Sequence, residues 1–115
     1  MPSIRITSIP PGEAPAAIRA AWVGLELPLK RSKPQRYLGS GVLSGPRNGI
    51  QTLLHMITLR LKVHTGFVVP ALSAIEILEA HHPAAGRWWR DNAPHAVQSG
   101  RVFLFPPECC ERVQD

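Results

Sequence analysis

The stretch SAIEILEAHHPAAGRWWRDN, residues 73–92, has the pattern of two helices in succession. Ser73, followed three residues later by Glu76, has the spacing of a capping box, which predicts the start of the first helix. The apolar residues after it continue the pattern to about His81. Pro83 suits the first position of a second helix, because a helix needs no amide hydrogen bond there. The stretch therefore predicts a helical hairpin.

The second helix of this hairpin places both of its tryptophans on one stripe. Ala85, Trp88 and Trp89 fall at i, i+3 and i+4, and apolar stripes at this spacing usually pack into a core. The alternative is an exposed aromatic pair beside Arg87 and Arg90, which would mark an interface because Trp and Arg dominate binding hot spots. We favour the buried arrangement and keep these four residues, Arg87 to Arg90, as a possible interface.

Short alternating or apolar runs on both sides of the hairpin predict β-strands. The clearest run covers residues 56–64, where apolar side chains alternate with polar and basic ones. Gly66 then either turns the chain into a hairpin or bends one longer strand, which ends at Pro70. Weaker patterns predict an edge strand at residues 4–9, strands at 22–29, 41–44 and 101–105, a short helix at 14–21 and a helical turn at 108–115.

The order of these elements is that of an α+β protein. The chain has 115 residues, of which 44% are hydrophobic and 18% charged, and this composition suits a single globular domain over residues 1–115. The packing that we favour is a small antiparallel β-barrel or curved sheet of about five short strands, packed by the helical hairpin of the C-terminal half. An open antiparallel sheet covered by the hairpin fits the pattern nearly as well.

Positive charge is concentrated in one part of the chain. The formal net charge is +5, and no Asp or Glu occurs between Leu27 and Ile75. The segment KRSKPQRYLGSG, residues 30–41, is predicted to be a basic surface loop. The residues that we expect to contact an acidic partner are Lys30, Arg31, Lys33, Arg36, Tyr37, Arg60, Lys62 and His64.

These residues fit a polyanion because Lys and Arg on alternate positions of a strand can follow successive phosphates. Tyr37 is the aromatic residue placed to stack on a base. The simpler interpretation is a solvated face, since edge strands carry Lys and Arg to discourage pairing with other strands.

The residue types of metal and catalytic sites occur here in unfavourable spacings. His81 and His82 are adjacent, as are Cys109 and Cys110, whereas zinc-chelating pairs are usually separated by two to four residues. The chain has no Gly-x-Ser-x-Gly, no glycine-rich phosphate loop and no paired carboxylates. We therefore predict no catalytic residue, no metal ligand and no cofactor.

The sequence thus favours a non-enzymatic small binding module whose positive surface, residues 30–64, contacts an acidic partner, with nucleic acid preferred. The alternatives are a protein–protein interaction module or accessory subunit, and, less favoured, a small enzyme. No segment has the length of a membrane span or the layout of a signal peptide, and adjacent cysteines suit a reducing compartment. We expect a soluble cytoplasmic protein without a membrane partner.

Overall fold

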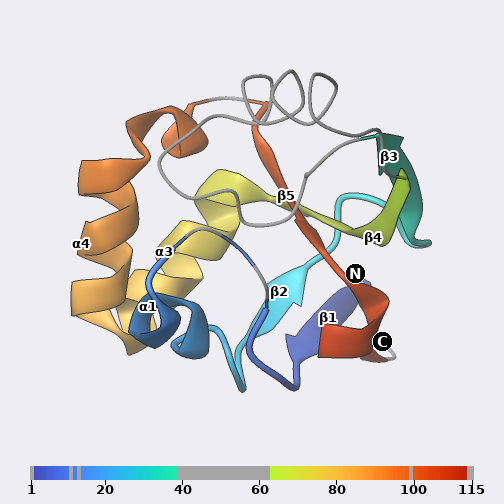
Figure 1. The fold of residues 1–115 in the computed structure, drawn as a ribbon, viewed down its shortest axis with the longest axis horizontal. Helices are drawn as coiled ribbons and strands as arrows, with labels where there is room; N and C mark the ends of the chain where they lie inside the picture. The colour runs from blue at the N-terminus through green and yellow to red at the C-terminus, as the bar shows by residue number, and fades with distance from the viewer. Residues whose placement is uncertain (1, 11, 13, 39–62, 99, 114–115) are drawn as a thin grey trace.

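The computed structural model describes residues 2–10, 12, 14–38, 63–98 and 100–113. Within these ranges the chain is α+β, with three α-helices and two small antiparallel sheets (Figure 1). The first sheet has the order β2 (Glu26–Pro28), β1 (Ser3–Ile6) and β6 (Cys110–Val113), and the second has the order β3 (Gln35–Leu38), β4 (Val63–Pro70) and β5 (Val102–Phe105). The helices are α1 (Ala16–Ala20), α3 (Ala71–His81) and α4 (Pro83–Asn92), and short 3-10 helices cover Pro94–Val97 and Pro107–Cys109. None of the helices in these ranges has the length and apolar character needed to cross a membrane.

The first sheet joins the two ends of the described chain. β1 lies at its centre, with Ser3 opposite both Pro28 of β2 and Val113 of β6. The prediction of an edge strand here is therefore wrong, because β1 is paired on both sides. The helical turn predicted in the tail is also wrong beyond Cys109, since the chain from Cys110 is the strand that pairs with β1.

The strand predicted at residues 22–29 is reduced to β2. Residues 21–24 form a turn that follows α1, and Gly24 adopts φ +92°, a left-handed conformation that suits glycine. The Gly24 amide donates to the Ile6 carbonyl at 2.8 Å, which ties the turn to the end of β1. The apolar alternation continues through the turn, and Trp22 is fully buried although it lies outside the strand.

The second sheet is built on one long strand. β4 pairs with β3 through residues 63–66 and with β5 through residues 67–70, so Gly66 lies within a continuous strand and not in a hairpin turn. A Cβ at this position would lie 2.7 Å from the Phe105 carbonyl oxygen, which explains why glycine is required. The predicted loop at residues 30–41 is partly wrong, since β3 occupies residues 35–38. The predicted strands at 41–44 and, up to residue 62, at 56–64 lie outside the described residues.

The helical hairpin is confirmed, with a different start. α3 begins at Ala71, directly after Pro70, and no side chain caps it, so the capping box at Ser73 is wrong. The Ala71 amide instead donates to the Arg101 carbonyl at 3.0 Å. The second helix begins at Pro83 as predicted. The two helices approach closely at Gly86, where an added Cβ would meet Glu79 Cβ and lie 2.7 Å from Glu79 Cα.

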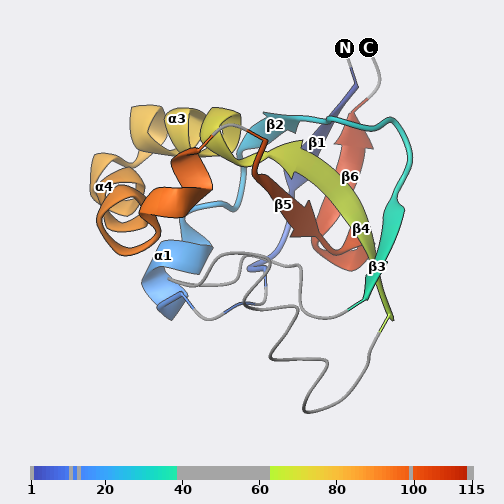
Figure 2. The same cartoon turned by 90° about the horizontal axis from the view of Figure 1, so that it is seen from above.

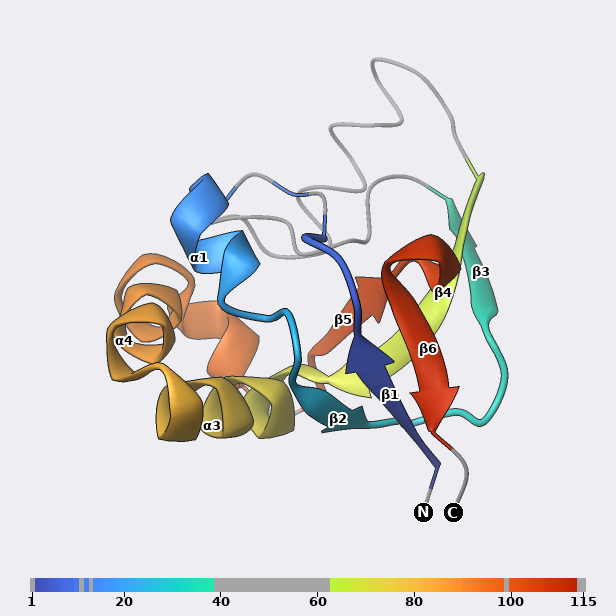
Figure 3. The ribbon, with the colours of Figure 1, turned by 90° about the horizontal axis from the view of Figure 1, so that it is seen from below.

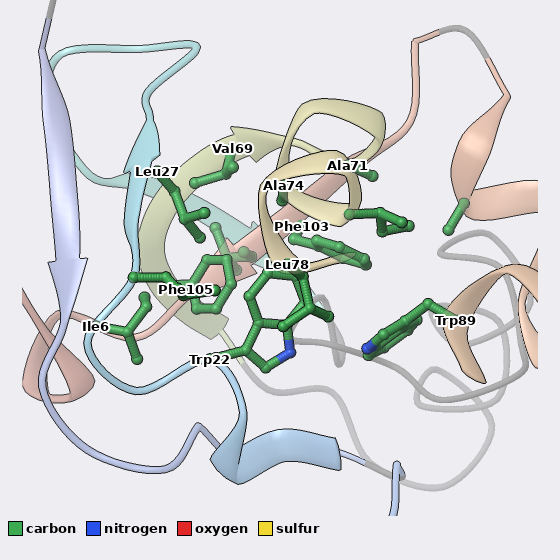
Figure 4. Packing of buried hydrophobic residues seen from close by; sticks show 14 of the residues in the cluster. Ile6, Trp22, Leu27, Val69, Ala71, Ala74, Leu78, Trp89, Phe103 and Phe105 are labelled. Carbon is green, nitrogen blue, oxygen red and sulfur yellow. The ribbon is translucent and has the colours of Figure 1, made fainter. Parts of the chain in front are cut away.

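An aromatic cluster forms the centre of the core (Figure 4). The ring of Trp22 lies 6.2 Å from Trp89, 5.7 Å from Phe103 and 5.6 Å from Phe105, measured between centroids. The indole nitrogens of Trp22 and Trp89 lie on the facing sides of the two rings, and both are buried without a hydrogen-bond partner. A buried polar group left unpaired costs about 1–3 kcal/mol, so close aromatic packing must offset this cost.

The helices and β3 lie at opposite sides of the molecule, and β4 and β5 run between them, where both contact α3 (Figures 2 and 3). α1, α3 and α4 gather on one side, whereas β3 lies on the other, and the first sheet lies between them along one face (Figures 2 and 3). Across the described strands the two sheets do not close into a barrel. The barrel or single curved sheet therefore stays a prediction.

Candidate functional site

The structure divides the predicted basic surface into three parts. Lys30, Arg31 and Lys33 are exposed in the connection between β2 and β3. Arg36 and Tyr37 lie in β3, where Tyr37 is the register partner of His64 in β4. Arg60 and Lys62 are outside the described residues. The sequence-predicted residues that can be placed thus follow one another from the β2–β3 connection onto the β3–β4 pair.

The backbone around the exposed cations is held at both ends. Before them, Leu29 is buried and its amide donates to the Pro2 carbonyl at 3.0 Å. The Lys30 amide donates to the Val68 carbonyl in β4 at 2.8 Å. After them, Gln35 pairs with Gly66, and its Nε2 donates to the Lys33 carbonyl at 3.0 Å. We call residues Lys30–Lys33 the basic turn.

Two acidic side chains of the first sheet, Glu26 and Glu111, pair with Arg5 and not with the cations of the basic turn. Glu26, the acid that precedes the turn in sequence, accepts hydrogen bonds from Ser3 and from Arg5, whose Nη2 lies 3.4 Å from Glu26 Oε1. Arg5 also pairs with Glu111 at 2.9 Å. Among the described residues, no ion pair involves Lys30, Arg31 or Lys33. The cations of the turn therefore have no ion-pair partner among the described carboxylates.

Fewer residues of α4 are exposed near the tryptophan pair than the predicted interface, Arg87 to Arg90, would require. Trp89 is fully buried and packs on Phe103 with ring centroids 5.1 Å apart, so it is not a surface anchor. Trp88 is half-buried, and its ring meets that of Trp89 edge-on at 5.1 Å. Arg87 is exposed. Near Trp89, the side chains of α4 that reach solvent are therefore those of Arg87 and, in part, Trp88.

Arg90 is committed to an ion pair between the two helices. Its Nε and Nη2 donate to the two carboxylate oxygens of Glu79 at 2.8 and 2.7 Å. The hydrogen bonds from Arg90 lower the pKa of Glu79, and those to Glu79 raise the pKa of Arg90. The paired guanidinium is less available to a partner than the free cations of the basic turn.

The cysteines have the environment of structural residues. Neither forms a disulfide; Cys109 is buried and Cys110 is half-buried. The Cys110 thiol donates to the Pro106 carbonyl at 3.3 Å, and burial, with smaller effects of Cys109 and Glu108, raises its pKa to about 12. A thiol with this pKa is protonated at neutral pH and is a poor nucleophile.

The histidine pair lies at the junction of the two helices, exposed to solvent. His81 Nδ1 is 3.0 Å from the Ile77 carbonyl oxygen, one helical turn earlier. Within the part of the chain that the structure describes, no three His, Cys, Asp or Glu side chains gather as a metal site would require. His81 and His82 thus belong to the end of α3 and the start of α4.

Sequence reasoning missed one charged cluster, on the outer face of the first sheet. Arg5 lies between Ile4 and Ile6, which point into the core, so the alternation itself indicated that Arg5 faces outward. Its partners Glu26 and Glu111 lie on the two flanking strands. They are 21 and 106 residues away in sequence, and nothing local indicates that they meet.

Comparison with known proteins gives no match: no family model, no curated protein and no solved structure resembles this chain at a significant level.

Proposed function

We propose that the protein is a non-enzymatic binding module whose positive surface contacts an acidic partner, and that this partner is nucleic acid. The observation that carries the proposal is the basic turn: Lys30, Arg31 and Lys33 are exposed, adjacent and free of ion pairs with the described acids. Clustered cations without nearby carboxylates create a positive potential that attracts polyanions.

The neighbourhood of the turn supports the same conclusion. β3, which follows the turn, lies at the edge of its sheet among the described strands, and its sequence includes Arg36 and Tyr37. Its pairing makes Tyr37 the register partner of His64, so both residues belong to the strand pair that follows the turn. Aromatic residues beside cationic side chains are the usual elements of a surface that binds single-stranded nucleic acid.

The proposal includes three expectations about the whole molecule. We expect one domain over residues 1–115, and the pairing of residues 3–6 with residues 110–113 supports it. We expect the sheets to form a curved sheet or small barrel, and the hydrogen bond from Lys30 to Val68 supports it because it links the end of the first sheet to the second. We expect a cytoplasmic location, in keeping with two unpaired cysteines.

The test is binding to labelled single- and double-stranded DNA and RNA at low and high salt. We expect binding at low salt whose affinity falls steeply as salt rises, because each phosphate contact releases counterions. Affinity that is insensitive to salt, or no binding to any of the four nucleic acids at low salt, would contradict the proposal.

A second candidate function is protein–protein interaction through α4. The observation in its favour is the half-buried Trp88 beside the exposed Arg87, since a partly exposed tryptophan next to an arginine is a common hot-spot arrangement. This candidate predicts that Trp88→Ala weakens association with a partner protein and leaves binding to nucleic acid unchanged. The basic turn variants described below should have the reverse effect.

A further inference from the structure

The basic turn differs from an ordinary surface loop because its backbone is held at both ends, while its charged side chains make no ion pair with the described acids. Hydrogen bonds from Leu29 and Lys30 hold its start, and Gln35 holds its end through both the β3–β4 pairing and its side-chain amide. All residues of the turn itself are exposed. We infer that the basic turn contacts the phosphate backbone of the nucleic acid and not its bases, and so supplies affinity that does not depend on sequence. This inference rests on the proposed function.

The turn lacks the apolar anchor that a protein partner would need. Among the described residues, the large hydrophobic side chains with substantial exposure are Ile9, Val23 and Leu72, and none of them lies in the turn or next to it in sequence. Leu29, immediately before the turn, is buried. Protein interfaces take most of their binding energy from buried aromatic or aliphatic anchors, whereas phosphate contacts need only cations and hydrogen-bond donors.

The three cations lie close enough together in the chain to contact neighbouring phosphates. The three residue steps from Lys30 to Lys33 span at most about 11 Å of extended chain. Phosphates along one strand of a duplex follow one another at about 3.4 Å of axial rise. The three side chains therefore reach a run of about three neighbouring phosphates, with Arg31 able to donate two parallel hydrogen bonds to one of them.

The chemistry of the side chains also suits phosphate. Lys30 and Lys33 end in ammonium groups that act as point charges on long flexible stems, and such groups are common phosphate ligands. Hydrogen bonds at both ends of the turn restrict its backbone before binding, which lowers the entropy that binding must overcome. A contact of this kind fixes the position of the nucleic acid and leaves sequence preference to other residues.

The test compares two triple variants that remove the same charge. The first is Lys30→Gln/Arg31→Gln/Lys33→Gln, and the matched control is Arg87→Gln/Arg101→Gln/Arg112→Gln. Each lowers the formal net charge of +5 by three, so a general effect of charge is equal in both. Thermal melts establish that both variants fold. Binding of the full chain to a labelled oligo-dT 20-mer and to two mixed-sequence 20-base-pair DNA duplexes is then measured over a series of KCl concentrations.

For the first variant, we expect the slope of log K against log salt to become shallower by about 2 to 3, since each neutralised phosphate contributes about 0.7 on single strands and 0.9 on duplexes. The loss of affinity should be equal for the two duplexes. The control should keep the wild-type slope. An unchanged slope in the first variant, an equal change in the control, or a loss confined to one duplex would overturn the inference while leaving nucleic-acid binding intact. Failure of the wild type to bind any probe at low salt would overturn the proposed function and the inference together.

Discussion

The helical hairpin and the basic turn lie on opposite sides of the molecule and are held in place by different interactions (Figures 2 and 3). The hairpin is fixed by side chains: Trp89 is fully buried, Gly86 lets the two helices meet, and Arg90 pairs with Glu79 across them. The turn is fixed by backbone hydrogen bonds, and its side chains make no ion pair with the described acids. Most side chains of the hairpin contribute to the fold, so few of them can contact a partner. The charged side chains of the turn do not hold the fold, so all three can contact a partner.

The largest effect on stability is expected at the tryptophan that joins the hairpin to the core. Trp89→Ala should destabilise the protein by about 3–5 kcal/mol, because it removes a fully buried ring in contact with Trp22 and Phe103. Urea unfolding followed by circular dichroism measures the change. Trp89→Phe should cost less, since it keeps an aromatic ring and removes the unpaired indole N–H.

Trp88→Ala is the matched control for this prediction. Trp88 is the neighbour of Trp89 in sequence but only half-buried, so its loss should cost clearly less. Equal losses at the two positions would mean that the tryptophans contribute alike to the core, and the distinction between a core residue and a surface residue on α4 would be wrong.

A smaller effect is expected where the two helices touch. Gly86→Ala should destabilise by about 1–3 kcal/mol, because the new Cβ would lie 2.7 Å from Glu79 Cα and the helices must separate. Alanine is otherwise the better helix former, so a loss of stability can be assigned to the contact. Arg87→Ala, one residue further along and exposed, is the control and should change stability by no more than about 0.5 kcal/mol. A Gly86→Ala protein more stable than the wild type would show that the helices are not in contact there.

Local patterns in the sequence predicted the parts of the fold that depend on local structure. The helix that begins at Pro83, the end of α3 at His81 and the strand at β5 follow from periodicity and from proline positions. The start of α3 was missed because the amide of Ala71 finds its partner in Arg101, which is distant in sequence. Trp88 and Trp89 could not be separated by pattern alone, since adjacent positions on a helix are only about 100° apart.

Elements that depend on pairing between distant segments could not be predicted. β6 has two exposed residues at its centre and no apolar alternation. It forms a strand because its backbone pairs with β1. β3 lies in a polar segment and is defined by its pairing with β4. The sequence indicated which residues of the candidate site are positive, but the hydrogen bonds from Lys30 to Val68 and from Gln35 to Lys33, which fix the turn, were not visible in it.

The ion pair across the helices predicts a pH dependence of stability. Arg90 lowers the pKa of Glu79 in the folded protein, chiefly by hydrogen bonding. A group whose pKa is lower in the folded than in the unfolded state stabilises the fold above its unfolded pKa, and this stabilisation disappears as the pH falls through the folded value. Glu79→Gln should therefore lose less stability than the wild type between pH 5 and pH 3, by a small amount because the pair is exposed to solvent.

Asp91→Asn serves as the control for this pH effect, since Asp91 is exposed on α4 and makes no ion pair with the described residues. Unfolding midpoints in urea at pH 7, 5, 4 and 3 give one profile for each of the three proteins, the wild type, Glu79→Gln and Asp91→Asn. The interpretation fails if the Glu79→Gln profile runs parallel to that of the wild type, or if Asp91→Asn flattens the profile as much.

The smallest effect on stability is expected at the basic turn, and it completes the comparison. Replacing Lys30, Arg31 and Lys33 with glutamine should change the free energy of unfolding by no more than about 0.5 kcal/mol per site, because these exposed side chains form no ion pair with the described residues and the turn is held by its backbone. Removing like charges from neighbouring positions can even stabilise the fold slightly, since their mutual repulsion is lost. Urea unfolding at low and high salt checks this. A large destabilisation would mean that the side chains hold the turn, and their exposure could then no longer be taken as availability to a partner.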